Sequence, residues 1–367
     1  MGSTIPQQEE EQVQLDATLG RRRTALDEVD TSTGAFKRKP SAYRDIVGGD
    51  AHPVEKNRYC LYISLACPWA CRCLAVYYMK GLESVIQLSI VHPVWGRTNP
   101  DKDSHTGWQF ADPDDPPKAN PAGYGSFSCE GCIPDPLHLD GVTYIRDLYE
   151  MSGDTNGKYT VPVLFDSVTR TIVNNESADI VRMLNASFNQ LIDDPHKASL
   201  DLYPPDLRES INTTNDMVYE SINNGVYRCG FAKSQEAYDE ANAELFAALD
   251  RCEDILTRSR YLCGDTITET DIRLFVTLIR FDTVYVVYFK TSNKTIREYP
   301  ALSDYVRDLY SVPEIRHSVN MKHIKHHYFA SHPTLNPYAI VPADGHPWWE
   351  DDHARYKMTK QAVAWSI

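Results

Sequence analysis

The fold is decided by the stretch Ser64-Leu65-Ala66-Cys67-Pro68-Trp69-Ala70, because it joins a predicted strand to a predicted helix. Residues 58–64 have the aromatic and branched composition of a strand, and the proline of this stretch suits the first turn of a helix. The helix is predicted to continue over 70–82, and a second strand over 85–91. Strand, helix and strand at this spacing predict a βαβ unit with a parallel pair of strands.

The following residues extend this unit with a helix, a hairpin and a further helix. A helix is predicted over 142–151, strands over 161–165 and 171–173 around a turn at 166–170, and a helix over 177–184. The order βαβ, helix, ββ, helix is that of the thioredoxin-like fold. Fold class is therefore α/β in the first half of the chain.

The second half of the chain is predicted to be all-helical. One apolar face recurs at three and four residues through Tyr238, Ala241, Leu245, Leu249, Cys252 and Leu256. Thr268 and Asp271 have the spacing of a capping box ahead of an apolar helix at 272–289. The predicted limits are 1–50 for an N-terminal arm, 51–190 for the thioredoxin-like domain with a long insertion at 93–141, 191–204 for a linker, 205–330 for the helical domain and 331–367 for a C-terminal extension.

Composition limits the function classes. The net charge of −14 disfavours a nucleic-acid or anionic-membrane partner, because phosphate groups would be repelled. The most apolar run, at 275–289, contains Arg280 and Asp282 and is too short to span a bilayer. The nine cysteines, an odd number, do not resemble a disulfide scaffold in a chain of 367 residues. We therefore expect a cytoplasmic protein.

Cys67 is the candidate nucleophile. A helix N-terminus presents free N–H groups and the positive end of the helix dipole, and both favour a thiolate over a thiol. Disulfide oxidoreductases carry a second cysteine three residues later, but Ala70 stands there in this chain. An external thiol must then complete the cycle, and glutathione is the abundant one. The competing interpretation is that Cys67 is a small buried apolar residue.

Other cysteines and histidines could indicate a metal. Cys67, Cys71 and Cys73 are close in sequence, and Cys129 and Cys132 form a single Cys-x-x-Cys. Neither spacing matches a common zinc or iron–sulfur ligand set, so we predict no metal. For Cys129 and Cys132 we favour inert thiols, with a loop disulfide or a redox-sensitive pair as the alternatives. The histidines that follow Lys322 are interpreted as a solvated basic face, namely His323, His326, His327 and His332.

At this point the residues resemble a known family. The sequence is similar to the glutathionyl-hydroquinone reductases, also called xi-class glutathione transferases, from about Tyr43 to Gly345. The motifs that carry the resemblance are Cys67-Pro68-Trp69-Ala70, Lys80-Gly81-Leu82-Glu83, Gly107-Trp108-Gln109-Phe110, Thr160-Val161-Pro162-Val163-Leu164, Ile172-Val173-Asn174-Asn175-Glu176-Ser177, the segment 223–232, Arg280-Phe281-Asp282-Thr283-Val284-Tyr285, the segment 324–332, and Asn336-Pro337 with Ile340-Val341-Pro342.

The resemblance implies a homodimer and a reaction. A glutathionyl-hydroquinone would be reduced by glutathione to hydroquinone and glutathione disulfide. Cys67 would form a mixed disulfide with glutathione, and Tyr227 would protonate the leaving aromatic carbon or oxygen. Tyr285 and Tyr328 match tyrosines whose hydroxyls favour the thiolate. Each tyrosine can alternatively be a core aromatic residue with a satisfied hydroxyl.

The resemblance also implies the glutathione contacts. Val161 precedes Pro162, whose peptide bond is predicted to be cis, and its backbone would pair with the cysteinyl unit. Glu176 and Ser177 begin a helix and would hold the γ-glutamyl end, with ordinary capping as the alternative. Trp108 would cover the tripeptide. Lys158 stands where the family has arginine, so a two-pronged carboxylate contact is in doubt there.

The sequence departs from the family elsewhere. Cys71 occupies a position that is often histidine, the segment 111–136 is longer than usual, and the extension after Gly345 is unexplained. Two other functions compete with the reductase. One is an omega-like thioltransferase or dehydroascorbate reductase, which uses the same single-thiol cycle. The other is a non-catalytic ligand-binding protein, which the retained Cys67 disfavours.

Overall fold

The computed structural model describes residues 28–332 and 335–358. Its central sheet has the strand order β2–β1–β5–β6, formed by β1 (Tyr59–Ile63), β2 (Gln87–Ile90), β5 (Val163–Asp166) and β6 (Thr171–Asn174). Strand β1 pairs in parallel with β2, whereas the β1–β5 and β5–β6 pairs are antiparallel. This is the mixed sheet of the thioredoxin-like fold, and it confirms the βαβ unit and the hairpin predicted from the sequence.

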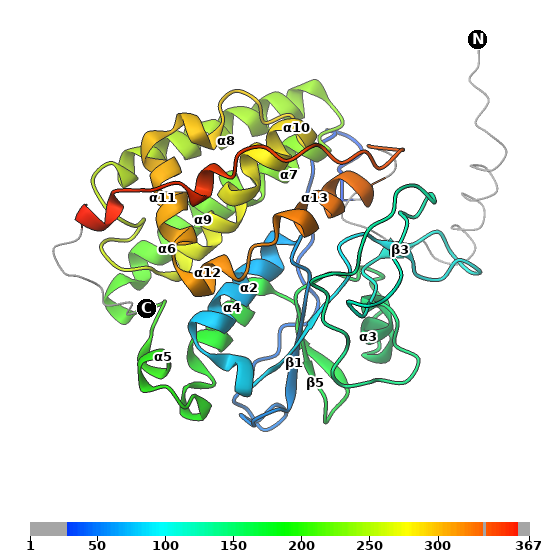
Figure 1. Cartoon of the computed structure of the whole chain (residues 1–367). Helices are drawn as coiled ribbons and strands as arrows, with labels where there is room; N and C mark the ends of the chain where they lie inside the picture. Colours follow the sequence, from blue (N-terminus) through cyan, green and yellow to red (C-terminus); the bar gives the residue numbers. More distant parts are fainter. Residues whose placement is uncertain (1–27, 333–334, 359–367) are drawn as a thin grey trace, which may run out of the picture.

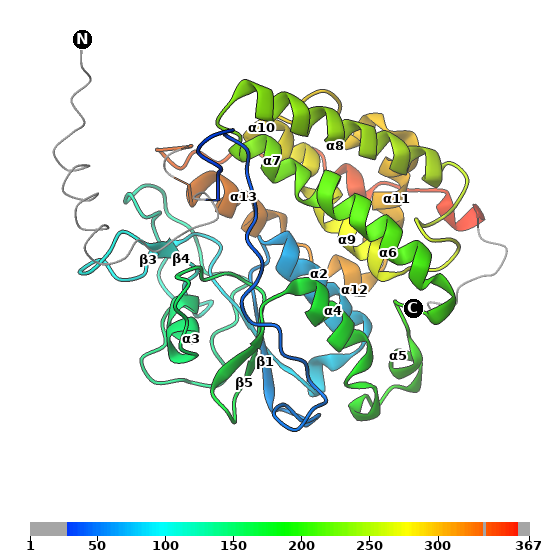
Figure 2. The ribbon, with the colours of Figure 1, turned by 180° about the vertical axis from the view of Figure 1, so that it is seen from behind.

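Three helices flank the sheet. Helices α2 (Pro68–Met79) and α4 (Ser177–Ala186) lie between the sheet and the helical domain, and α3 (Ile145–Met151) lies on the opposite face (Figures 1 and 2). Helix α2 follows β1 directly, with Cys67 as its N-cap residue and proline at the first helical position. A proline fits there because the first N–H groups of a helix have no intrahelical partner.

The second half of the chain forms a helical domain above the sheet in Figure 1. The short helix α5 (Pro195–Ser199) lies in the connecting segment, low in Figure 1. The helical segments of the domain are α6 (Arg208–Met217), a π-helical turn (Val218–Asn223), α7 (Gly225–Phe231), α8 (Gln235–Leu256), α9 (Glu269–Arg280), a second π-helical turn (Phe281–Tyr285), α10 (Val286–Tyr288), α11 (Pro300–Tyr310), α12 (Pro313–Arg316) and α13 (Met321–Ala330). The predicted apolar helix at 272–289 is thus α9, a π turn and α10 in succession. Within the described residues, no helix is both long and apolar enough to cross a bilayer.

The apolar periodicity and the capping box place α8 and α9 as predicted. The Tyr238–Leu256 pattern falls entirely within α8, and its buried face includes Leu245, Leu249 and Cys252. Thr268 caps α9 with the Asp271 side chain bonded back to the Thr268 N–H at 2.8 Å. Since α9 is buried along its whole length, this cap satisfies backbone groups that water does not reach.

The insertion at 93–141 is a folded part of the thioredoxin-like domain. It contains the short strands β3 (Gly96–Arg97) and β4 (Thr106–Gly107), and Ile133 exchanges two backbone hydrogen bonds with Ile90 of β2, at 2.9 and 3.0 Å. Its Cys129 and Cys132 are free thiols buried beside Ala111. The loop packs on α13, where the Glu130 carbonyl lies 2.6 Å from His323 Nε2.

The interpretation of the α13 histidines as a solvated basic face is wrong. His323, His327 and His332 are buried, and so is Lys325. They pack against the insertion and the tryptophans of the cavity wall, and burial lowers the pKa of His332 to about 4. The sequence misled because the partners that bury this face are about 200 residues away along the chain.

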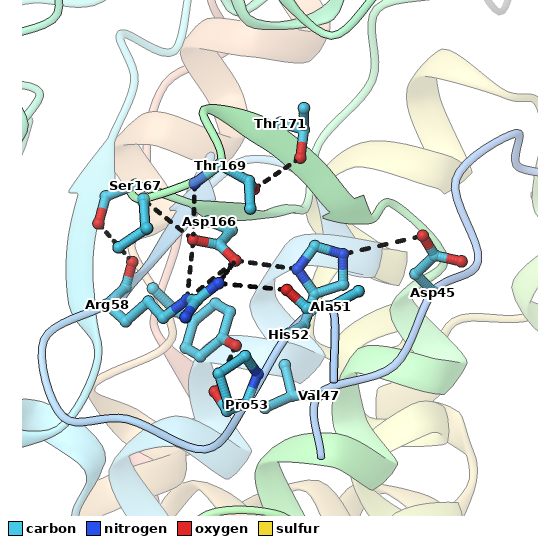
Figure 3. Close-up of polar contacts among 12 residues, drawn as sticks. Asp45, Val47, Ala51, His52, Pro53, Arg58, Asp166, Ser167, Thr169 and Thr171 are labelled. Carbon is cyan, nitrogen blue, oxygen red and sulfur yellow. Dashed lines mark hydrogen bonds and ion pairs between the residues drawn. The ribbon is translucent and has the colours of Figure 1, made fainter. Parts of the chain in front are cut away.

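A polar network ties the N-terminal segment to the end of β5. Asp166 accepts hydrogen bonds from His52 Nδ1 at 2.9 Å and from Arg58 Nη2 at 2.7 Å, and Arg58 also donates to the Ala51 carbonyl (Figure 3). Asp45 lies on the far side of the imidazole, 3.8 Å from His52 Nε2. The Asp166 side chain is fully buried. Although burial alone raises its pKa, the bonds from Arg58 and His52 lower the pKa of Asp166 to about 2.

Candidate active site

A cavity of about 340 Å³ lies where the two domains meet, at the N-terminus of α2. It is lined by residues of the N-terminal segment, the thioredoxin-like domain and the helical domain. Nine of the ten predicted site residues line it, namely Cys67, Trp108, Lys158, Val161, Pro162, Glu176, Ser177, Tyr227 and Tyr328. The tenth, Tyr285, is fully buried behind the wall.

Cys67 is partly exposed on this cavity, at the junction of β1 and α2. Its Sγ lies 3.5 Å from the carbonyl oxygen of Val161, and the Val161–Pro162 peptide bond is cis, as predicted. Val161 therefore places a backbone edge directly beside the sulfur. An extended peptide can pair with such an edge as a strand would.

The predicted low pKa of the cysteine is wrong for this geometry. Burial raises the pKa of the Cys67 thiol to about 11, and the amides of Ala70 and Trp69 and the Arg280 charge offset this rise only in part. The helix N-terminus acts in the predicted direction, but desolvation is the larger effect. Chemistry at this sulfur must therefore remove a proton.

Three tyrosines form a hydrogen-bonded cluster next to the sulfur. The Tyr227 and Tyr328 hydroxyls are 2.8 Å apart, and those of Tyr285 and Tyr328 are 3.1 Å apart. Burial raises the pKa of all three, so they stay protonated. Tyr227 and Tyr328 line the cavity, whereas Tyr285 does not line it and bonds to Tyr328 behind it. The cluster can deliver a proton to a molecule bound above Cys67.

Beneath this cluster lies a buried cation that the sequence analysis did not identify. Arg280, at the end of α9, donates to the Leu65 and Ala66 carbonyls at 3.1 and 3.2 Å and to Cys71 Sγ at 3.0 Å. It is fully buried. The guanidinium thus holds the strand end that precedes Cys67 and places a positive charge near the sulfur. It lowers the pKa of Cys67, although burial dominates.

Glu176 and Ser177 present polar groups at the N-terminus of α4. Glu176 caps the helix by accepting from Ala178 N–H, and Ser41 of the N-terminal segment donates to its other oxygen at 2.9 Å. Arg72 of α2 donates to Ser177 Oγ at 2.5 Å. The capping alternative is confirmed for Glu176, which also lines the cavity, and its contact with the γ-glutamyl end of glutathione stays a prediction.

Trp108 and Lys158 lie on the other walls. Trp108 stacks on His327 with ring centroids 4.5 Å apart and meets Trp95 edge-on. Lys158 forms a 2.7 Å ion pair with Glu28 of the N-terminal segment. Its charge is therefore already compensated, and burial lowers its pKa.

The N-terminal segment supplies cavity residues that the sequence analysis missed. Arg38 and Ser41 line the cavity, and Phe36 packs in the core. Trp95 and His332 also line it from the insertion and the end of α13. The apolar Phe36 in an otherwise polar stretch was the one signal that this segment docks. Within the described residues, no group of three or more potential ligands has the arrangement of a metal site.

A thioredoxin-like domain, a helical domain and a helix-capping cysteine at their junction define the class of the glutathione transferases. The glutathione S-transferase N-terminal domain model matches residues 66–187, and the C-terminal domain model matches residues 235–308. The chain is 42% identical to the glutathionyl-hydroquinone reductase YqjG of Escherichia coli, over 87% of this chain and 91% of that protein. It is 40% identical to glutathione S-transferase omega-like 2 of Schizosaccharomyces pombe, over 87% and 96%.

Solved structures agree. The xi glutathione transferase of Phanerochaete chrysosporium has a TM-score of 0.76 and 44% identity, covering 87% of this chain and 95% of that chain. The glutathione-bound structure of YqjG has a TM-score of 0.72 and 40% identity, covering 86% and 96%. The chain therefore belongs to the glutathionyl-hydroquinone reductase family, the xi class of glutathione transferases.

Proposed function

We propose that this protein reduces S-glutathionyl-hydroquinones with glutathione, releasing the hydroquinone and glutathione disulfide. The observation that carries the proposal is the meeting of a single reactive-position thiol, Cys67, with the hydroxyls of Tyr227 and Tyr328 on one cavity wall. Exchange with a mixed disulfide of glutathione needs only the Cys67 thiol, because the leaving group is itself a sulfur. A bond between sulfur and an aromatic ring needs, in addition, a proton for the ring carbon.

The first step exchanges two bonds. The Cys67 sulfur attacks the sulfur of the conjugate, the bond between that sulfur and the ring carbon breaks, and its electron pair stays on the ring. Tyr227 donates a proton to that carbon as the hydroquinone leaves. Cys67 gives up one proton and the ring gains one, so the step is balanced for a thiol that is protonated at neutral pH, as the raised pKa of Cys67 requires.

The second step restores the thiol. A second glutathione attacks the glutathionyl sulfur of the mixed disulfide, and glutathione disulfide leaves. The proton of the incoming thiol returns to Cys67. Val161 pairs with the cysteinyl unit of bound glutathione, and Glu176 and Ser177 hold its γ-glutamyl end. With Lys158 already paired to Glu28, the glycyl carboxylate is held by a weaker contact than the family's arginine gives.

The test is intact-mass analysis after mixing with S-glutathionyl-hydroquinone in the absence of free glutathione. We expect one glutathionyl unit per chain, mapped to Cys67, and one equivalent of free hydroquinone. Adding glutathione then releases glutathione disulfide and restores the original mass. Hydroquinone release without an adduct, or an adduct on another cysteine that persists in Cys67→Ser, contradicts the mechanism.

A second candidate function is that of an omega-like thioltransferase or dehydroascorbate reductase. The 40% identity to an omega-like relative favours keeping it in view. The two functions differ in the need for a proton donor to carbon. If Tyr227→Phe reduces the rate on the conjugate and on a small glutathione mixed disulfide to the same extent, the thioltransferase is favoured. A homodimer, which the resemblance implies, stays a prediction that sedimentation analysis can check.

A further inference from the structure

The N-terminal segment carries a cation into the cavity that the mechanism above does not use. Arg38 lies with its guanidinium carbon 4.9 Å from the ring centroid of Trp69 and 5.0 Å from that of Tyr227. Its Nε donates to Asn224 Oδ1 at 3.1 Å, across 186 residues of sequence. Arg38 also lines the cavity. The guanidinium thus lies against the rings of both Trp69, the residue after the Cys-Pro pair, and Tyr227, the proposed proton donor.

The backbone on both sides of Arg38 is fixed, and on the C-terminal side the Lys39 N–H donates to Glu28 Oε1 at 3.0 Å. Phe36 is buried, and its ring packs on Phe231 with centroids 5.5 Å apart. Gly34 accepts a hydrogen bond from the Lys233 N–H at 2.9 Å. In Figure 2 this segment is the dark-blue stretch that runs from the helical domain down to the sheet. Arg38 is therefore held in place by the fold, as a specificity-determining group needs to be.

The cavity wall around Arg38 has hydrogen-bond donors without acceptors. Among the described residues, the shielded Arg38 Nη2 has no partner, and neither has Trp69 Nε1 or Trp95 Nε1. No carboxylate of residues 28–332 or 335–358 lies within ion-pair distance of Arg38. These three nitrogens are shielded from solvent, so a ligand can meet only the part of the Arg38 guanidinium that lines the cavity, and no carboxylate in the described part of the chain compensates the charge of that guanidinium. Aromatic rings on the same wall, from Tyr219 and Phe231, fit a flat ring.

We propose that Arg38 is a specificity-determining residue whose guanidinium donates a hydrogen bond to a ring oxygen of the hydroquinone. This assignment rests on the proposed function, because it names the part of the substrate that Arg38 reads. A hydroquinone oxygen carries partial negative charge and lone pairs that accept a hydrogen bond. A guanidinium at that oxygen is matched to this charge, and glutathione alone offers no ring oxygen to it.

The experiment measures binding in the Cys67→Ser protein, where no disulfide forms. Two probes are compared by calorimetry: S-glutathionyl-hydroquinone, and S-methylglutathione, which lacks the ring. We expect Arg38→Met to raise the Kd of the conjugate by about ten-fold or more, the effect of losing a charge-assisted hydrogen bond. The Kd of S-methylglutathione should change by less than about two-fold. Lys37→Met is the matched control, since it removes an exposed cation of the same segment, paired with Asp30.

Each outcome has a distinct meaning. An equal rise in both Kd values would show that Arg38 binds the tripeptide or merely holds the segment, and it would overturn the assignment. No rise for the conjugate would overturn it as well. Because binding is read without turnover, the result is independent of the reductase assay. If the wild-type protein fails to reduce the conjugate while the Kd ratio changes as expected, the proposed function fails and the ring contact of Arg38 stands.

Discussion

The two ends of the thioredoxin-like domain treat buried polar groups in opposite ways. At the end of β5, Asp166 has partners on every side, from Arg58 and His52 to the backbone of its own turn. At the N-terminus of α2, Cys67 and its neighbours leave donors unpaired, and burial raises the pKa of Cys67. A fully paired group fixes the fold, whereas an incompletely paired one is ready for a ligand. This difference separates stability from function within one domain.

The largest expected effect is a loss of turnover that follows from changing the active site at the N-terminus of α2 alone. Cys67→Ser should lower turnover of S-glutathionyl-hydroquinone by at least about a thousand-fold, because a hydroxyl cannot form the mixed disulfide. Steady-state release of hydroquinone measures it. Cys252→Ala, in the α8 core away from the cavity, is the control and should keep its turnover. Residual activity above about a tenth in Cys67→Ser would remove the cysteine from the mechanism.

The next effect is a loss of stability that follows from changing the Asp166 network at the end of β5 alone. Arg58→Met should lower the free energy of unfolding by about 3 to 5 kcal/mol, because it leaves the buried Asp166 carboxylate without its strongest partner. Urea unfolding measures it. Lys322→Met removes an exposed pair with Glu130 and should cost less than about 1 kcal/mol. Equal losses of unfolding free energy in the two variants would mean that the Asp166 network does not stabilise the fold. A loss of turnover in folded Arg58→Met would show that this network also supports the active site at the N-terminus of α2.

A smaller effect tests how the cavity divides its work. Tyr227→Phe should lower kcat for S-glutathionyl-hydroquinone by about a hundred-fold, since the ring carbon loses its proton donor. The Tyr328 hydroxyl, 2.8 Å away, limits the loss by serving as a substitute donor. On a small glutathione mixed disulfide, which needs no proton on carbon, the rate should stay within about two-fold. The comparison of the two substrates is itself the control for misfolding.

What the sequence predicted, and what it could not, follows the range of the contacts. The strand–helix junction at Cys67 and the Thr268 capping box depend on neighbouring residues and were predicted from them, whereas the cis bond at Pro162 was predicted from the resemblance to a known fold. The docking of Arg38 and the burial of His327 depend on residues about 190 and 230 positions away. Local patterns carry no information on such pairs, so the polar segments looked exposed.

The thiol pKa went wrong for a related reason. A helix N-terminus is visible in the sequence, and it lowers the pKa of Cys67 as predicted. Burial is a property of the assembled domains, because Tyr227 and Tyr328 of the second domain line the same cavity as Cys67. The sequence therefore predicts that the helix N-terminus lowers the pKa of Cys67, but it does not predict the direction of the total shift. Both contributions together decide whether the sulfur carries a proton.

The mildest test sharpens the comparison through pH. For an acid whose folded pKa is about 11, the rate of alkylation by iodoacetamide should rise about ten-fold per pH unit from pH 7 and level only near pH 11. A plateau at or below pH 8 would instead show a thiolate stabilised by the α2 amides and Arg280.

The pKa of Asp166 is shifted in the opposite direction, below its usual value, so its effect is seen in acid. Its pKa of about 2 adds stability above the unfolded value near 4, and that stability is lost as the pH falls toward 2. Alkylation rates across the alkaline range and urea midpoints across the acidic range therefore report the two ends of the domain separately.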